Sequence, residues 1–555
     1  MTNKKNKVMK DGKRMENAIS TLFLLYMGVI FPLIMHDKYF DITVTKYKTF
    51  QVGVCLYAIL MVLAVVAELP AVKGYSVKKE LLSAKDERGI TSFIKKHNIM
   101  PVDVCMCAFF LANVCAFIVA EDKLSAYTGE SGRRCGLLFM ILAYLVYVCL
   151  GRGYKLPAII PFTFLCTGSF SAVVALLQYA GIDFLKLRKG LTESQGRIYI
   201  STFGNIDIYA SFLCVFVPVA MGIYLLSHNS KQNTEKGTSK KETASIKDKA
   251  KMFLDRALPV ASFASICIGS SAMASTNADL AYAGIIVALA FLFVAALSLG
   301  SLHRFVDVMI AVCGGFLLAG IVGQRDGSSL EYLDGISAFV TRIKPMTMVL
   351  FMLVVIRVIL LSLKKAVCRV KGKKAFVIGV LSVVAVGILT LWAGVHFEVI
   401  PVHMDDSWGN YRGYVWSRLL ESYRGFSPVN KIIGYGNETV KAIMSGSYYE
   451  EMMDVVGVIY DNAHNEYIQY LVTTGLFGLL SYVFLIVCAI YSMVKCIRLS
   501  EDSANRGLYL GVMLGIIGYA AQAAFNLNQA LTTPYLFVLI GLAAGISRNT
   551  CHKAL

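Results

Sequence analysis

Long apolar runs alternate with short polar connections along almost the whole chain. Each run approaches the roughly 17–25 residues that a helix needs to cross a bilayer. The pattern therefore predicts an all-α polytopic membrane protein with about fourteen transmembrane helices. The predicted spans lie near residues 18–35, 50–68, 101–120, 135–150, 157–180, 207–227, 257–274, 280–300, 304–323, 346–363, 375–395, 468–494, 508–524 and 533–547.

One polar stretch, residues 396–467, is too long to be a simple connection. Unstructured loops beyond about 15 residues are usually functional or disordered, and the many Tyr and Trp residues here argue against disorder. We therefore expect three parts. Transmembrane helices occupy 1–395, with a basic cytoplasmic loop at 228–256. A large extracytoplasmic loop with short interfacial helices and the catalytic motifs occupies 396–467, and C-terminal transmembrane helices occupy 468–555.

Part of this outer loop has the spacing of a short amphipathic helix. Val415, Leu419, Leu420 and Tyr423 recur at helical intervals and share one face. Pro428 ends the pattern, because a helix rarely continues through the residue before a proline. Such a helix is typical of a membrane interface, so we expect it to lie on the outer surface of the bilayer.

The charge is strongly positive, with a formal net value of +18. Three basic runs dominate it, Lys4–Arg14, Lys231–Arg256 and Lys364–Lys374, and the predicted spans place all three on the side of the N-terminus. Positive residues collect on the cytoplasmic side of membrane proteins. We therefore expect a cytoplasmic-membrane protein with both termini in the cytoplasm, whose basic runs contact membrane lipid rather than nucleic acid.

The fourteen cysteines lie almost entirely within apolar runs or on the predicted cytoplasmic side. A zinc site needs about four convergent ligands, and the pair Cys105 and Cys107 has none nearby in its span. The pattern therefore predicts no disulfide, no metal site and no cofactor.

Several polar residues stand where apolar runs meet the predicted outer side. A charged group at bilayer depth costs a few kcal/mol, so polar groups near the boundary usually face a wet cavity or the interface. Their number on one side predicts a cleft that opens outward. They are Arg197, Asn205, Asp207, Asn277, Asp279, Arg325, Arg342, Lys344, Asn526, Asn528 and Gln529.

The most specific motif lies where the outer loop re-enters the membrane. His464-Asn465 is followed, after nine residues, by Gly475 and then by Gly478. This order resembles the signature of the bacterial O-antigen ligase and O-antigen polymerase family. Two upstream stretches resemble other family features: the Gly-Asn helix start in "TFGNIDIYASFL", and the Arg-x-x-x-Trp helix with a Gly-x-Gly turn in "YRGYVWSRLLESY…IIGYGNE".

Members of this family are integral membrane glycosyltransferases. The resemblance therefore implies transfer of a glycan from undecaprenyl pyrophosphate to an acceptor hydroxyl on the outer face of the cytoplasmic membrane, in cell-surface polysaccharide biosynthesis. His464 matches the family's catalytic His, with Asn465 beside it, and Arg412 matches an Arg assigned to the donor pyrophosphate. Trp416 lies four residues after Arg412 and would share its helix face. The acceptor, a glycan or a lipid-linked glycan, and the choice between ligase and polymerase stay open.

The chain departs from the family at one position. Where many ligases have Ser-Arg-Gly at the outer end of a helix pair, this chain has Ala278-Asp279-Leu280. A second phosphate-binding arginine is therefore missing there. Arg197, Arg325, Arg342 or Lys344 could replace it, and Arg197 is favoured because it precedes the Gly-Asn helix start.

These residue types suit the chemistry of glycan transfer from a pyrophosphate. Arginine pairs bidentately with phosphate oxygens and stays charged. A sugar hydroxyl needs a base to attack, and an imidazole such as that of His464 contributes about 10²–10⁴-fold as a general base. Gly475 and Gly478 would let neighbouring helices pack closely and fix the start of the helix after His464. We expect metal-independent transfer with inversion, with activity falling as the pH drops through about 6.5, the ordinary His pKa.

Two other classes of function remain. A transporter or flippase of lipid-linked glycans would also need many helices, but transporters usually bind substrate near the bilayer midplane between repeated halves. A structural scaffold or receptor would leave the His and Arg arrangement unused. The concentration of polar residues at the outer ends of the spans favours the enzyme.

Overall fold

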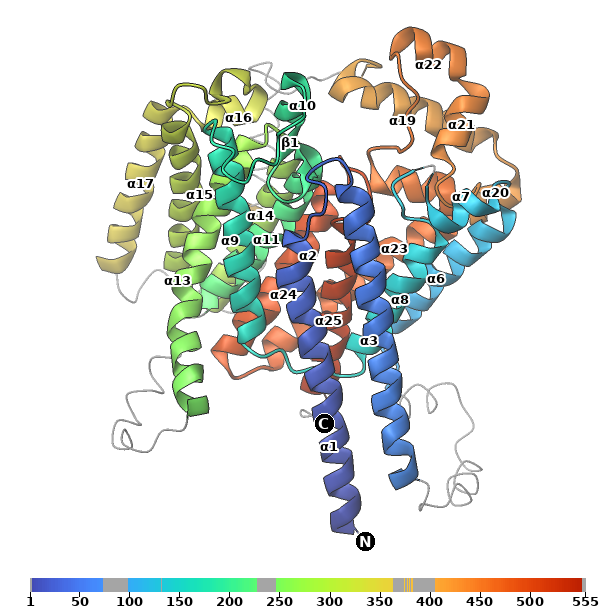
Figure 1. The fold of residues 1–555 in the computed structure, drawn as a ribbon. Coiled ribbons are helices and arrows are strands. Elements are labelled where there is room, and N and C mark those ends of the chain that lie inside the picture. The colour runs from blue at the N-terminus through green and yellow to red at the C-terminus, as the bar shows by residue number, and fades with distance from the viewer. Residues whose placement is uncertain are drawn as a thin grey trace.

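The computed structural model is a helical bundle with a smaller helical cap at one end (Figure 1). It describes residues 2–72, 98–130, 132–226, 246–362 and 405–551, together with Lys374, Val377, Gly379, Leu381 and Ser382. Most of the predicted span at 375–395, the start of the outer loop at 396–404, and most of the two central basic runs lie outside the described residues.

The described bundle consists almost entirely of helices. Its elements are α1 (Thr2–Leu25), the π-helix η1 (Tyr26–Ile30), α2 (Phe31–Leu33), α3 (Ile42–Val72), α6 (Pro101–Val119), α7 (Lys123–Thr128), α8 (Leu137–Gly151), α9 (Ile159–Tyr179), α10 (Glu193–Ile198), β1 (Tyr199–Ile200), β2 (Gly204–Asn205), α11 (Ile206–Leu226), α13 (Ile246–Ser275), α14 (Leu280–Leu299), α15 (Leu302–Val322), η4 (Leu330–Tyr332), α16 (Gly335–Val340), α17 (Ile343–Ser362), α23 (Glu466–Leu499), α24 (Ser503–Gln522) and α25 (Thr533–Cys551).

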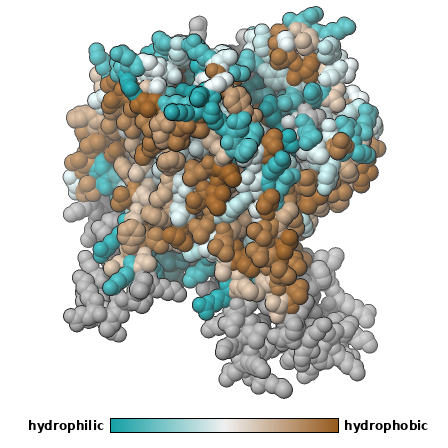
Figure 2. Space-filling view, in the orientation of Figure 1, coloured by the Kyte–Doolittle hydropathy of each residue, from teal (hydrophilic) through white to brown (hydrophobic). Residues whose placement is uncertain are grey.

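The expectation of an all-α polytopic membrane fold is confirmed. Among the described residues, ten helices are long and apolar enough to cross a membrane, and three further predicted spans fall on helices α8, α24 and α25. Figure 2 shows apolar side chains in a band across the middle of the molecule and hydrophilic ones at the end that carries the cap. The total of fourteen spans stays a prediction.

Helix α11 forms the centre of the bundle. Almost all of its residues are buried, because α24, α13 and α14 pack around it. Glycines permit the closest approach: a Cβ at Gly222 would meet the backbone of Gly511, and one at Gly518 would meet the carbonyl of Cys214. Small residues at such crossings are the usual means of packing helices in lipid, where there is little hydrophobic drive between helices.

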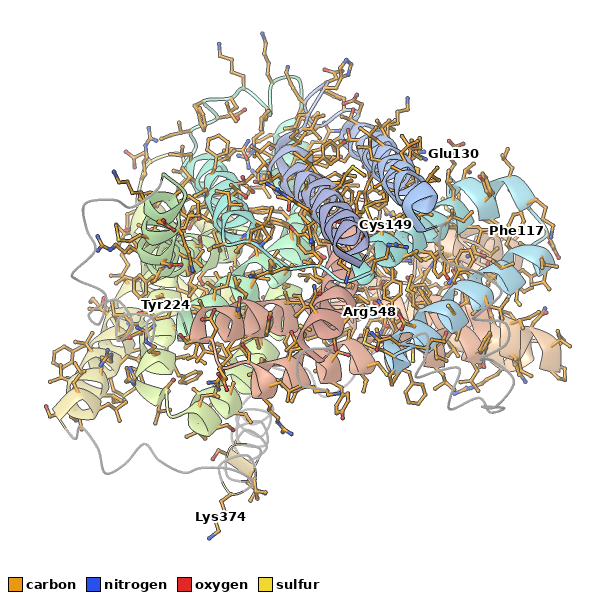
Figure 3. All side chains as sticks on the ribbon, turned by 90° about the horizontal axis from the view of Figure 1, so that it is seen from below. Phe117, Glu130, Cys149, Tyr224, Lys374 and Arg548 are labelled. Carbon is orange, nitrogen blue, oxygen red and sulfur yellow. The ribbon has the colours of Figure 1, made fainter. Side chains whose placement is uncertain are left out.

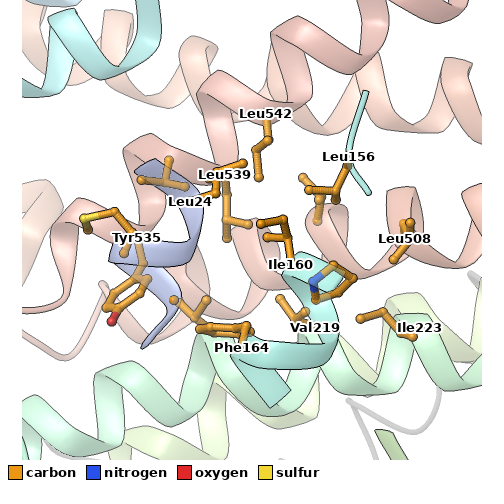
Figure 4. A pocket seen from close by; sticks show the side chains of 16 residues that line it. Leu24, Leu156, Ile160, Phe164, Val219, Ile223, Leu508, Tyr535, Leu539 and Leu542 are labelled. Atoms are coloured by element: carbon orange, nitrogen blue, oxygen red, sulfur yellow. The ribbon is translucent and has the colours of Figure 1, made fainter. Parts of the chain in front are cut away.

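Apolar side chains leave a cavity of about 80 Å³ beside α11. Figure 4 shows it between Leu24 of α1, Phe164 of α9, Val219 of α11 and Leu539 of α25. Its lining includes no charged residue, and an apolar cavity of this kind stays dry. It therefore offers no polar chemistry.

One ion pair inside the bundle joins α25 to α6. Figure 3 views the molecule from the end that carries both termini and shows Arg548 among the helices. Its guanidinium donates to the Asp103 carboxylate at 2.6 Å and to the carbonyl of Gly151. Such pairing is required because an unpaired charge is costly in an apolar environment.

The cap, residues 405–465, contains α19 (Trp408–Gly425), α20 (Pro428–Ile433), α21 (Val440–Ser447) and α22 (Tyr449–Val455). It has a core of its own, in which Val415 and Leu419 of α19 pack with Val440 and Met444 of α21. The predicted apolar face of α19 is therefore buried within the cap, with Leu420 half-buried. Helix α19 ends at Gly425, and Pro428 opens the next helix.

The two glycines of the His464 motif have different roles. At Gly475 the backbone of α23 leaves the helical conformation, with φ +69° and ψ −173°. A Cβ there would meet the carbonyl of Ile432 and the nitrogen of Gly434, so Gly475 lets the end of α20 pack onto α23. A Cβ at Gly478 would instead meet Thr474 of the same helix. The expectation that Gly478 allows close packing with a neighbouring helix is therefore wrong.

We predict that Gly475→Ala lowers the thermal stability of the detergent-purified protein. The φ and ψ of Gly475 are accessible almost only to glycine, and strain of this kind costs of order 1–3 kcal/mol, before the collision with α20 is added. Gly446→Ala is the matched control, because Gly446 is exposed on α21 and has open space around its Cβ position. Equal melting temperatures for the two variants would contradict the packing described here.

Candidate functional site

A polar cavity of about 260 Å³ lies between the cap and the bundle. The first residues of α3 and α11 line its wall, and His464 lines it two residues before α23 begins. Helix N-termini carry a partial positive charge and favour anions. The lining residues are Tyr39, Phe40, Asp41, Ile42, Thr43, Val44, Arg133, Tyr199, Asn205, Asp207, Ile208, His464 and Leu527.

His464 reaches this cavity from a rigid turn. Its backbone is left-handed, with φ +49°, and its N–H donates to Asn462 Oδ1 at 2.9 Å. Its Nδ1 lies 3.3 Å from the carbonyl oxygen of Asn462. Because a carbonyl only accepts, this contact favours the tautomer with the proton on Nδ1, which leaves Nε2 as the basic atom.

Neighbouring side chains hold the turn in place. Asn462 is buried and donates to Asn528 Oδ1 at 3.0 Å. The Trp416 indole of α19 donates to the carbonyl of Ala463 at 2.8 Å. Trp416 thus links the cap helix to the residue directly before His464, and the prediction of a supporting role for Trp416 has a physical basis.

The imidazole of His464 is held neutral. Burial, together with the positive charges of Arg412 and Arg133, lowers its pKa to about 3. In the free protein the basic form therefore persists well below pH 6.5. We expected activity to fall as the pH drops through the ordinary His pKa. That expectation assumed a solvated ring and is corrected, because the ring is buried.

Arg412 approaches His464 from the cap. Gly409, Asn410 and Tyr411 have left-handed backbones, so the right-handed turns of α19 begin only at Arg412. Its Nη2 lies 3.4 Å from Asp207 Oδ2, at the first turn of α11. The side chain is only 19% exposed. A half-buried cation is therefore near enough to lower the pKa of the imidazole.

Two of the predicted asparagines cap helices. Asn465 Oδ1 accepts the N–H groups of Tyr467 and Ile468 at 3.0 and 3.1 Å, so it fixes the start of α23. Asn205 Oδ1 accepts the N–H of Asp207 at 2.8 Å, at the start of α11. Capping of this kind is typical of Asn. Both residues position the site, and Asn205 also lines the cavity.

The remaining predicted residues lie elsewhere. Arg197 pairs with Glu193 at 2.6 Å and stacks 3.7 Å above the ring of Tyr332. Asp279 accepts the N–H of Ile336 at the start of α16. None of these side chains lines the cavity of His464.

Arg325 and Arg342 also stand apart from His464. They lie with α15, α16 and α17, on the far side of the bundle from the cap (Figure 1). Arg342 and Lys344 line a separate open pocket of about 450 Å³. The structure therefore does not bring the four substitute cations predicted from sequence next to His464.

Sequence reasoning missed Arg133. It follows α7 in the turn before α8, far from the cap in sequence, yet it lines the cavity with His464. Its Nη2 lies 3.0 Å from Asp461 Oδ1. The Gly-rich "GESGRRCG" stretch (129–136) was the available signal, but nothing in it indicates that the cap packs over this turn.

Comparison with known families gives one match. A family model described as O-antigen ligase matches residues 335–483. This region of the chain is therefore similar to the O-antigen ligase family. The match runs from α16 to the middle of α23 and includes Arg412, Trp416 and His464. No curated protein matches the chain.

This match, together with the apolar helices, supports an integral membrane protein of surface polysaccharide biosynthesis. Lipid-linked glycans are the general substrates of that family. The cavity between cap and bundle lies partly inside the matched region, through His464, and partly outside it, through Arg133 and Asp207.

Glu438 links the cap to the turn that carries Arg133. Its pKa leads to a prediction about how stability depends on pH. Its carboxylate accepts the N–H of Arg133 at 2.8 Å, and burial raises its pKa to about 7 from the ordinary 4.5. A raised pKa means that the folded protein binds more protons than the unfolded one. The contribution of Glu438 to the free energy of unfolding is therefore fully present below pH 4.5, and it is lost as the pH rises through 7.

We expect Glu438→Gln to become more stable relative to the wild type as the pH rises from 5 to 8. The amide carries no charge, so it escapes the cost of ionisation inside the protein. Melting temperatures across this range provide the measurement. Glu450→Gln, at an exposed position on α22, should track the wild type. A difference between Glu438→Gln and wild type that stays constant with pH would contradict the raised pKa.

Proposed function

We propose that this protein transfers a glycan from undecaprenyl pyrophosphate to an acceptor hydroxyl, without a metal ion, on the outer face of the cytoplasmic membrane. The observation that carries the proposal is that the neutral His464 imidazole lines a cavity at the starts of α3 and α11, and that Arg412 pairs with Asp207 in the wall of the same cavity. A base and a cationic site for phosphate are the two groups that such a transfer requires.

The proposed reaction is a direct displacement. The acceptor oxygen attacks the anomeric carbon, and the bond between that carbon and the phosphate oxygen breaks. The acceptor proton passes to Nε2 of His464, which the Nδ1 contact leaves free. The electron pair of the broken bond stays on the pyrophosphate, whose growing charge Arg412 stabilises. Displacement from the opposite side inverts the anomeric carbon.

The position of the cavity supports transfer over transport. The lipid carrier must keep its tail in the bilayer while its phosphates reach the ends of the helices. The cavity lies at the starts of α3 and α11 rather than at their middles. A transporter or flippase would instead bind its substrate near the bilayer midplane.

We predict that His464→Gln lowers the initial rate of glycan transfer in proteoliposomes by about 10²–10⁴-fold, the usual contribution of a general base. Glutamine keeps the polar contact but has no basic nitrogen. In the wild type, kcat/KM should stay level from pH 8 to pH 5, because it reports the free enzyme, in which the pKa of His464 is lowered to about 3. Near-normal turnover by His464→Gln would exclude the catalytic role and favour transport.

The proposed orientation places the cap outside and both termini in the cytoplasm. We predict that a single cysteine at Ser445, exposed on α21, reacts with a membrane-impermeant maleimide in intact cells of a cysteine-free variant. A cysteine at Ser239, outside the described residues, should react only after the cells are opened. The reverse pattern would overturn the orientation.

A further inference from the structure

One cation of the cavity has no role in the proposed reaction. Arg133 lines the cavity with His464 and Asp207, and its side chain is 38% exposed. It comes from the α7–α8 turn, outside the region that matches the O-antigen ligase model. Arg412 comes from the cap, so the two arginines reach the site from different parts of the fold.

Arg133 is held from three directions. Its N–H donates to the buried carboxylate of Glu438 at 2.8 Å. Its carbonyl accepts the N–H of Ala530 at 3.4 Å, from the connection between α24 and α25. Its Nε and Nη2 lie 3.2 and 3.0 Å from Asp461 Oδ1. The two backbone contacts fix the turn that carries Arg133, and the contact with Asp461 fixes its guanidinium, so the side chain is positioned in advance, as a binding residue benefits from being.

The guanidinium keeps capacity for a second anion. It has five N–H donors in a planar fork, and Asp461 occupies the edge formed by Nε and Nη2. Among the described residues, no hydrogen bond is made by Nη1 of Arg133. That half of the fork therefore remains able to bind an oxyanion in the cavity.

Both arginines lie at the same cavity. Arg133 lines it with His464 and Asp207, and Arg412 pairs with Asp207 at 3.4 Å; the positive charges of both also lower the pKa of the His464 imidazole. A monophosphate can occupy one of two separated cations, whereas a diphosphate can bridge both. This difference gives the pair of arginines a way to distinguish the two kinds of lipid carrier.

We propose that Arg133 is the second phosphate-binding arginine of this enzyme, and that Arg133 and Arg412 together select a polyprenyl diphosphate over a polyprenyl monophosphate. The proposal rests on the proposed function. Many family members have an arginine where this chain has Asp279. In this chain Arg133, from a different loop, would take the role of that arginine.

Binding measurements on the full-length protein in nanodiscs test this proposal. The probes are radiolabelled undecaprenyl diphosphate and undecaprenyl monophosphate, so that neither the glycan nor the acceptor has to be known. The wild type should prefer the diphosphate. Arg133→Gln should weaken diphosphate binding by about tenfold or more, the effect of losing a charge-assisted hydrogen bond, and should change monophosphate binding much less.

Arg134→Gln is the matched control. Arg134 is the next residue in the same turn, but it pairs with Glu130 at 3.4 Å and lies 5.9 Å from the ring of Tyr47 instead of lining the cavity. It should keep the preference of the wild type. Because Arg133→Gln leaves Asp461 without its cation, the double variant Arg133→Gln, Asp461→Asn is measured in parallel and should show the same loss of preference.

The outcomes separate this proposal from the proposed function. If the wild type prefers the diphosphate and a folded Arg133→Gln or double variant keeps that preference, Arg133 is not the second ligand, while the proposed transfer stands. An equal loss with Arg134→Gln would also overturn the proposal, because it would show only a general effect of charge. If the wild type binds neither carrier, the proposed function itself fails.

Discussion

The site depends on two ion pairs that join the cap to the bundle, Arg412 with Asp207 and Arg133 with Asp461. Each pair brings together residues from distant parts of the chain, and each places a cation beside His464. Removing one partner of a half-buried pair leaves a charge that is costly to keep out of water. Docking of the cap therefore completes the site, because His464 comes from the cap while the other residues that line the cavity come from the bundle.

Local sequence signals identified the parts of the site that a single segment encodes. His464, with Asn465 as the cap of the following helix, and Arg412, with Trp416 one turn later, stand in patterns that can be found without a structure. The helical spans are equally local, because apolar length alone decides them.

The rest depends on tertiary packing. Arg133 joins the site only because Glu438 and Asp461 of the cap bind its turn. The cations that the sequence favoured do not lie next to His464. Proximity to a helix start, as at Arg197, does not determine which cavity a side chain enters. The pKa of His464 likewise depends on burial and on two arginines that the sequence does not place beside it.

The same electrostatics give a reason for the order of events in the proposed transfer. In the free protein, two arginines and burial make His464 a weak base. A bound diphosphate would bring negative charge next to those arginines, cancel their effect on the ring and raise the pKa of His464, because an opposite charge nearby favours the protonated imidazole. The base would thus gain strength only when the donor is in place. After transfer, the imidazolium and the arginines would together stabilise the departing pyrophosphate, so that one arrangement of charge serves both the attack and the leaving group.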